Sequence, residues 1–125
     1  MRRDMDLIRT FLIRTEESDG PVRDASLTTW AGSRAKALYH VELMRDCGLV
    51  RASVRMVTGP DLATFSIDGL TWEGCDYLDA IRSDSVWRRA KDAVAAVIGD
   101  APLSVMKSVC TSLVLKAVQS ELGIS

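Results

Sequence analysis

The chain has 125 residues, 47% of them hydrophobic and 26% charged, which is the composition of an ordinary soluble domain. Its 16 Lys and Arg residues and 17 Asp and Glu residues give a net charge of −1, without the basic excess of a dedicated DNA-binding domain. A chain of this length buries a core without disulfides or metals, so we expect one domain over residues 1–125. No run reaches the roughly 20 apolar residues of a membrane span, and the charged start does not resemble a secretory signal. We therefore expect a cytoplasmic protein with no membrane partner.

The first element is predicted to be a helix over residues 4–18, because apolar residues recur there at helical spacing. Ser18-Asp19-Gly20-Pro21 stops it. Residues 22–29 are irregular and rich in β-branched side chains near their end, which favours a short strand or an extended loop. Little room is left for a regular second helix before Ser33.

A second helix is predicted over residues 33–47, with Ser33 as its N-cap and Gly48 at its end. Its inward face is formed by Ala37, Val41 and Met44, at spacings of four and three.

Two alternating segments follow, residues 49–56 and 62–67, and they predict a hairpin with one buried face. Gly59-Pro60-Asp61 forms the turn between them. A helix followed by such a hairpin is typical of a winged helix-turn-helix, here reduced by the missing second helix. We expect an α+β fold with a winged-helix core over residues 1–70, a small antiparallel sheet and a wing at about residues 56–63.

Long helices are predicted over residues 71–125. Thr71 caps the first, a break or new cap falls at Ser83-Asp84-Ser85, and Pro102 opens the last. A core stripe is predicted from Trp72, Cys75, Leu78 and Ile81, and Trp87 is also expected to pack inside. The last helix is so apolar that it is central to the core or half of an oligomer contact, and we expect a homodimer through it.

The sequence contains few residues or motifs that are typical of a catalytic site. The single histidine, His40, excludes a histidine metal cluster, and the sequence holds no nucleophile elbow, P-loop or dinucleotide-binding motif. Cys47, Cys75 and Cys110 lack zinc-ligand spacing and are interpreted as buried hydrophobes. We expect no catalytic, cofactor or metal site, and therefore no enzyme.

The second predicted helix carries the best candidates for nucleic-acid contacts. We predict that it presents Arg34, Lys36, Tyr39 and His40 to DNA, and that Arg51 and Arg55 on the following strand add phosphate contacts. Two observations favour other interpretations. The favoured interpretation of His40 is a surface or boundary residue that helps to cap or pack the helix, and the predicted wing tip carries Asp61 and no Lys or Arg.

Trp30 and Leu43 are the candidate contacts to a protein partner. Trp30 stands in a loop beside Ala31-Gly32, where a tryptophan either plugs the base of the helix or anchors a binding surface. Leu43 lies on the outer edge of the helix that it shares with the candidate DNA-binding residues.

Three segments carry a resemblance to a known family: residues 1–9 (MRRDMDLIR), 39–50 (YHVELMRDCGLV) and 70–82 (LTWEGCDYLDAIR). The chain resembles a family of small uncharacterised phage and prophage proteins, catalogued as a domain of unknown function. The segment from His40 to Val50 is also similar to the recognition helix of ArsR-like repressors. The resemblance implies a bacterial host cell and brings no activity, cofactor or site residue with it.

Two functions are compatible with these observations. The first is a phage-derived DNA-binding or transcriptional accessory protein with regulatory function. The alternative is a protein-binding module that inhibits a host complex, such as a bacterial defence system, in the manner of anti-CRISPR proteins. The helix and hairpin order favours the first, whereas the net charge and the acidic wing tip favour the second.

Overall fold

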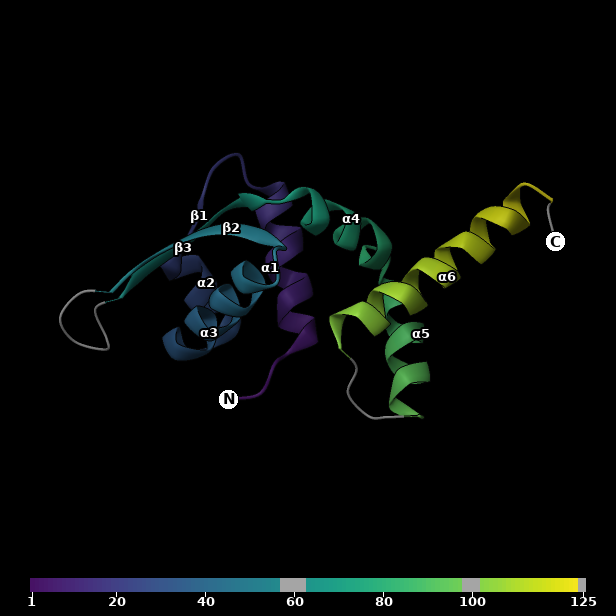
Figure 1. Cartoon of the computed structure of the whole chain (residues 1–125), viewed down its shortest axis with the longest axis horizontal. Helices are drawn as coiled ribbons and strands as arrows, with labels where there is room; N and C mark the ends of the chain where they lie inside the picture. The colour runs from purple at the N-terminus through teal and green to yellow at the C-terminus, as the bar shows by residue number, and fades with distance from the viewer. Residues whose placement is uncertain (57–62, 98–101, 124–125) are drawn as a thin grey trace. The chain divides into compact units, whose positions relative to one another are not determined.

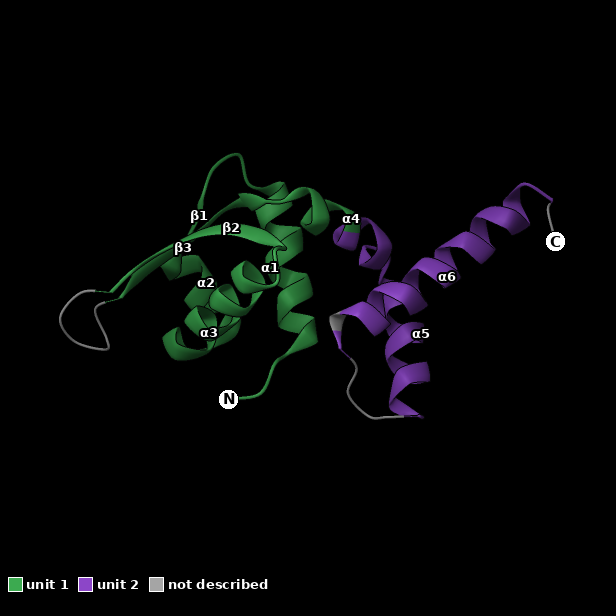
Figure 2. Cartoon of the chain, viewed as in Figure 1, with its two compact units in different colours: residues 1–76 green, residues 77–125 purple. Residues whose placement is uncertain are grey.

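The structure, a computed structural model, describes residues 1–56, 63–97 and 102–123 (Figure 1). Within these ranges the fold is α+β, as predicted, with six helices and a three-stranded antiparallel sheet. The chain divides into two compact units, Met1–Asp76 and Tyr77–Ser125 (Figure 2). The predicted turn at Gly59-Pro60-Asp61 lies outside the described residues.

The first unit begins with α1 (Met5–Glu17), which matches the predicted helix. The Asp4 carboxylate caps it by accepting a hydrogen bond from the Leu7 N–H at 3.1 Å. One face of α1 is buried in the core through Leu7, Ile8, Phe11, Leu12 and Thr15.

The prediction of an irregular, β-rich segment without a second helix is wrong. Strand β1 (Val22–Arg23) has two residues, and α2 (Asp24–Ala31) follows it directly. Leu27 of α2 is completely buried, so packing outweighs the weak helix propensity of the neighbouring threonines. Gly32, with a φ of 88°, ends the helix in a left-handed conformation that a side chain would strain.

Helix α3 (Arg34–Asp46) confirms the second predicted helix and its caps. The Ser33 hydroxyl accepts a hydrogen bond from the Lys36 N–H at 3.1 Å. The predicted inward residues are buried: Ala37, Val41 and Met44. Gly48 follows with a φ of 81° and turns the chain toward the sheet.

The sheet has the order β1-β3-β2, with β2 (Val50–Arg55) and β3 (Thr64–Leu70) as its longer strands. Its inner face packs against the three helices of the unit (Figure 1). Ser66 of β3 pairs with Arg23 of β1 on one side and with Ser53 of β2 on the other. This row of three residues belongs to the outer face of the sheet.

Helices α4 (Trp72–Ile81), α5 (Asp84–Ala95) and α6 (Leu103–Glu121) complete the chain. The break predicted at residue 83 is confirmed, because the Ser83 hydroxyl accepts a hydrogen bond from the Val86 N–H at 3.3 Å. Trp87 is buried, as expected. Within the second unit, α5 packs against α6.

The core stripe predicted along α4 is wrong in its first half. Trp72 is 80% exposed and Cys75 is exposed, whereas Gly74 is buried. The reason is a close contact between Gly74 and the Leu49 carbonyl, which places the glycine on the inner side of the helix. Leu78 and Ile81 are buried as predicted, together with Tyr77.

Two of the three cysteines are also placed differently from the prediction. Cys47 and Cys75 are exposed, and Cys110 of α6 is buried. Cys47 is the C-cap residue of α3, where the chain leaves the helix at the surface. No helix among the described residues is both long and apolar enough to cross a membrane.

Candidate nucleic-acid interface

Arg34, the first of the predicted DNA-binding residues, holds α2, α3 and β3 together. Its Nη2 donates a hydrogen bond to the Asp24 carboxylate at 2.9 Å and another to the Ala63 carbonyl. The guanidinium also lies over the Phe65 ring, 5.2 Å from its centroid. Arg34 is therefore half-buried and engaged in contacts within the first unit.

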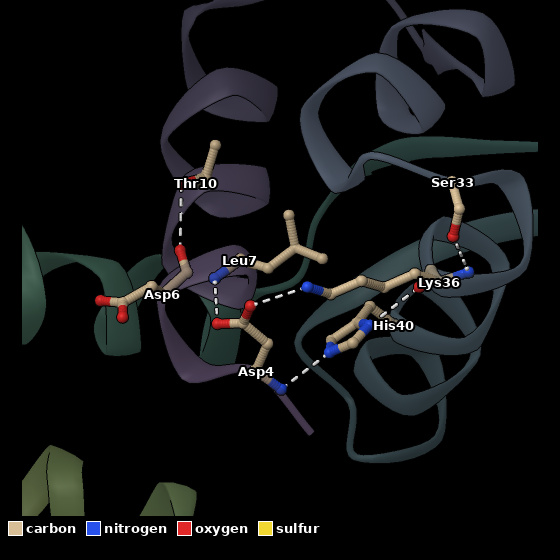
Figure 3. A network of polar contacts seen from close by, with 7 residues as sticks. All are labelled: Asp4, Asp6, Leu7, Thr10, Ser33, Lys36 and His40. Carbon is tan, nitrogen blue, oxygen red and sulfur yellow. Dashed lines mark hydrogen bonds and ion pairs between the residues drawn. The ribbon is translucent and has the colours of Figure 1, made fainter. Parts of the chain in front are cut away.

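Lys36 and His40 form a second internal network with Asp4, at the start of α1 (Figure 3). The Lys36 ammonium lies 3.0 Å from the Asp4 carboxylate. The His40 side chain is completely buried. Its Nε2 accepts a hydrogen bond from the Asp4 N–H at 2.8 Å, and its Nδ1 donates one to the Lys36 carbonyl, also at 2.8 Å. This pattern requires a neutral imidazole with its proton on Nδ1.

The placement of His40 corrects the prediction that it faces DNA. A buried ring with both nitrogens hydrogen-bonded has no atom left for a base or a phosphate, so His40 packs inside the first unit and does not lie at its surface or boundary. Burial, the largest cause, lowers the pKa of His40 below its ordinary value, and the Lys36 carbonyl and the charge of Asp4 offset this in part. Burial raises the pKa of Asp4, but the hydrogen bonds from Lys36 and Leu7 outweigh it, so that this pKa is lowered.

The outward surface of α3 is not basic. Tyr39, Glu42 and Leu43 are half-buried, and Arg45 and Asp46 are exposed. Two carboxylates thus stand against one arginine on the part of α3 that faces solvent. A phosphate backbone would meet little net attraction here.

Trp30, the predicted protein contact, packs at the edge of the core. Its ring lies 6.3 Å from that of Phe11, and the Arg14 guanidinium lies over it at 5.6 Å from the centroid. The tryptophan is half-buried and lines an open surface hollow of about 550 Å³ together with Arg14, Ser26 and Arg23.

The outer face of the sheet carries the predicted strand arginines. Arg51 and Arg55 are exposed and alternate with Ser53 along β2. The Arg51 Nη1 donates a hydrogen bond to the Leu70 carbonyl at 3.0 Å, so this side chain lies across β3. Arg55 lines a second hollow, of about 230 Å³, which Arg23 of β1 also lines.

The structure thus separates the predicted residues into two groups. Arg34, Lys36 and His40 form internal contacts, whereas Arg51 and Arg55 remain on an exposed face. No group of three or more potential metal ligands occurs among the residues that the structure describes.

Comparison with known proteins identifies the family to which this chain belongs. A family model described as "Hypothetical protein (DUF2513)" matches residues 2–99. The chain belongs to the DUF2513 family. It is similar to an uncharacterized protein of Haemophilus influenzae, with 29% identity over 119 residues that cover 91% of this chain and 96% of the relative. No solved structure matches the chain.

The resemblance to a family with a domain of unknown function is confirmed by this match. The matched residues of this DUF2513 protein include α1 to α5 and both surface hollows, whereas α6 lies beyond residue 99.

Arg23 is, with Arg2 and Arg3, only a secondary candidate for phosphate contacts from the sequence, and the structure places it on this surface. It stands in a two-residue strand within a stretch interpreted as irregular, and its partners lie more than 40 residues away in the chain. The exposed arginine after buried Val22 is consistent with strand alternation, but two residues are too few to indicate it.

Proposed function

We propose that this protein is a non-catalytic, phage-derived DNA-binding or transcriptional accessory protein with a winged-helix core, acting in the cytoplasm of a bacterial host. One observation carries the proposal, namely the order of elements in the first unit. Two helices, α2 and α3, are joined by the short Gly32-Ser33 turn and followed by the β2–β3 pair, while β1 adds to β3 at the centre of the sheet. A helix-turn-helix with an adjacent hairpin is a recurrent DNA-binding arrangement.

The charges of the unit indicate how such a protein would hold DNA. Arg51 and Arg55 are exposed on the hairpin, whereas Arg34 and Lys36 are paired with Asp24 and Asp4. We therefore expect contacts to phosphates from the hairpin side, with little base reading from the first turns of α3.

The test is binding of the purified protein to DNA fragments from its own genomic surroundings at several salt concentrations. A complex with about 4 phosphate contacts has a slope near −3.5 in a plot of log affinity against log salt. We expect Arg51→Gln with Arg55→Gln to flatten the slope by about 2. Absence of binding even at low salt would refute the proposal.

Arg34→Ala with Lys36→Ala is a poor test of DNA binding, because both residues form internal contacts. A loss of affinity in that variant would report on the fold as well as on the interface.

A second candidate function is a protein-binding module that inhibits a host complex. The observation that favours it is the solvent-facing side of α3, where Tyr39 and Leu43 stand next to Glu42 and Asp46. Tyrosine and leucine bordered by charges are suited to a protein contact. Here Tyr39→Ala with Leu43→Ala is expected to abolish association with an isolated host complex, and Arg55→Gln to leave it intact.

Homodimerisation through α6 is part of the proposal. The later part of α6 exposes Leu115 and Val118, and Leu122 follows at the end of the helix with 67% exposure. A second copy of the chain is the partner that we propose for these side chains.

A further inference from the structure

Two arginines from different strands converge on one hollow of the outer sheet face. Arg23 of β1 and Arg55 of β2 both line the 230 Å³ hollow. Three residues with hydroxyl groups also line it, Ser53, Ser66 and Thr64. Guanidinium groups with neighbouring hydroxyls are the donors that bind phosphate oxygens in proteins.

Other basic side chains of the first unit form ion pairs with carboxylates. Arg34 and Lys36 are each within 3.0 Å of a carboxylate, and Arg14 is 3.7 Å from Glu17. In the part of the chain that the structure describes, Arg23 and Arg55 have no ion-pair partner. Both arginines are exposed residues.

The acidic groups around the hollow are already engaged. Asp24, which lines it, binds Arg34 through Oδ2 and the Ala25 N–H through Oδ1. The pairing of β2 with β3 contains a bulge at Asp68, because Arg51 pairs with Gly69 and Ala52 pairs with Ile67.

The two serine hydroxyls donate to the Asp68 carboxylate, at 2.6 Å from Ser53 and 2.8 Å from Ser66. Donors for an anion are therefore the two guanidinium groups and the Thr64 hydroxyl. Asp68 contributes a negative charge close to them, which weakens the attraction for an anion.

Arg23 also links this hollow to its larger neighbour. The 550 Å³ hollow is lined by Arg23, Arg14 and Trp30. There the Arg14 guanidinium lies over the ring of Trp30. The linings of the two hollows together contain Arg14, Arg23 and Arg55 with the aromatic residues Trp30 and Phe65, and arginines beside aromatic groups are found in surfaces that follow a nucleic-acid backbone.

We propose that the hollow between Arg23 and Arg55 binds a phosphate group, and that in the complex with DNA this group is a backbone phosphodiester. The DNA backbone then crosses the outer face of the sheet at β1, instead of being held only by α3 and the hairpin. The second part rests on the proposed DNA-binding function, whereas the first part stands without it.

The first experiment uses pyrophosphate as a probe of the full chain. Titration followed by amide NMR is expected to shift the signals of residues 23, 53, 55, 64 and 66, and Arg23→Gln with Arg55→Gln is expected to abolish the shifts. The matched control is Arg45→Gln, because Arg45 is an exposed arginine on α3. Shifts that are spread over the surface, or that persist in the double variant, would overturn the phosphate site.

The second experiment measures the affinity for a duplex oligonucleotide. Each of Arg23→Gln and Arg55→Gln is expected to lower it by roughly tenfold at low salt, and Arg45→Gln by much less. Asp68→Asn is expected to raise it, since the amide keeps an acceptor for a serine and loses the charge. Glu42→Gln on α3 is the control for that gain.

The outcomes separate the two proposals. Pyrophosphate binding without DNA binding supports the phosphate site and overturns the proposed function, leaving a free phosphate compound as the ligand. DNA binding that is insensitive to Arg23→Gln, while Arg51→Gln with Arg55→Gln still flattens its salt dependence, supports the proposed function and overturns the site.

Discussion

At the scale of single residues, His40 connects the start of α1 to α3. The ring is buried, its Nε2 accepts the Asp4 N–H, and its Nδ1 donates to the Lys36 carbonyl. Protonation would put a second hydrogen on Nε2, directly against the Asp4 N–H. The neutral ring is therefore the form that fits the folded state.

The stability of the protein should consequently depend on pH through His40. Its pKa is lowered in the folded state from the ordinary 6.5, so the unfolded chain binds the proton first as the pH falls. The contribution is fully present above pH 6.5 and is lost as the pH falls from that value toward the folded-state pKa. The pKa of Asp4 is lowered from 3.8, so its contribution persists above that pH and does not produce the change.

Urea unfolding at about pH 7.5, 6 and 5 measures this dependence as the free energy of unfolding. We expect His40→Gln to be less stable at high pH and to have a flatter profile between pH 6.5 and 5. An unchanged profile in that variant would assign the pH dependence to other groups.

Gly74 provides a second prediction at this scale. A Cβ at this position would collide with the Leu49 carbonyl oxygen, a backbone atom that cannot move aside alone. Gly74→Ala should therefore destabilise the protein by about 1–3 kcal/mol, although alanine is the better helix former. The control is Gly20→Ala, because a Cβ there meets nothing within 4 Å. Equal stabilities of the two variants in urea would contradict the predicted collision.

At the scale of elements, the position of α3 depends on contacts with segments far away in the chain. Arg34 bonds to Asp24 of α2 and to the Ala63 carbonyl before β3, while Lys36 and His40 bind Asp4. The helix itself was predictable, since Ser33, Gly48 and the spacing of its apolar residues are local signals. The sequence could not show which polar residues of α3 face inward, because the partners of these residues are 10 to 36 residues away in the chain.

The Arg34 contacts lead to a prediction about stability. Arg34→Ala should lower the free energy of unfolding by about 1–3 kcal/mol, because it leaves the buried Ala63 carbonyl and Oδ2 of Asp24 without the hydrogen bonds that Arg34 donates. Urea unfolding is the measurement, with Arg45→Ala as the surface control, expected to change stability by no more than about 0.5 kcal/mol. A double-mutant cycle with Asp24→Ala should be non-additive.

At the scale of the whole molecule, the two compact units use their helices differently. In the first unit, three helices cover one face of the sheet and leave its other face to solvent. In the second unit, Met106 and Cys110 are the buried residues of α6 among those described, whereas its later part exposes Leu115 and Val118. Exposed apolar side chains grouped on one helix are typical of an interaction surface.

We expect the protein to associate as a homodimer through these α6 side chains. Analytical ultracentrifugation of the chain should give an average mass that rises with concentration from 13.7 kDa toward twice that value. Leu115→Gln with Val118→Gln should keep the monomer mass, and Ser112→Gln, at an exposed polar position of the same helix, should leave association intact. A wild-type protein that stays monomeric at high concentration would contradict the expected dimer.

Local signals in the sequence determined the α+β class, the positions of α1, α3 and the hairpin strands, and the break between α4 and α5, because caps and apolar periodicity act within a few residues. Tertiary structure alone decided the other features. Helix α2 forms because burial of Leu27 outweighs weak propensity, and Gly74 sets the face of α4 through a distant carbonyl. Arg23 and Arg55 line the same hollow because β3 pairs with β1 on one side and with β2 on the other, and this pairing depends on contacts that no short stretch of sequence contains.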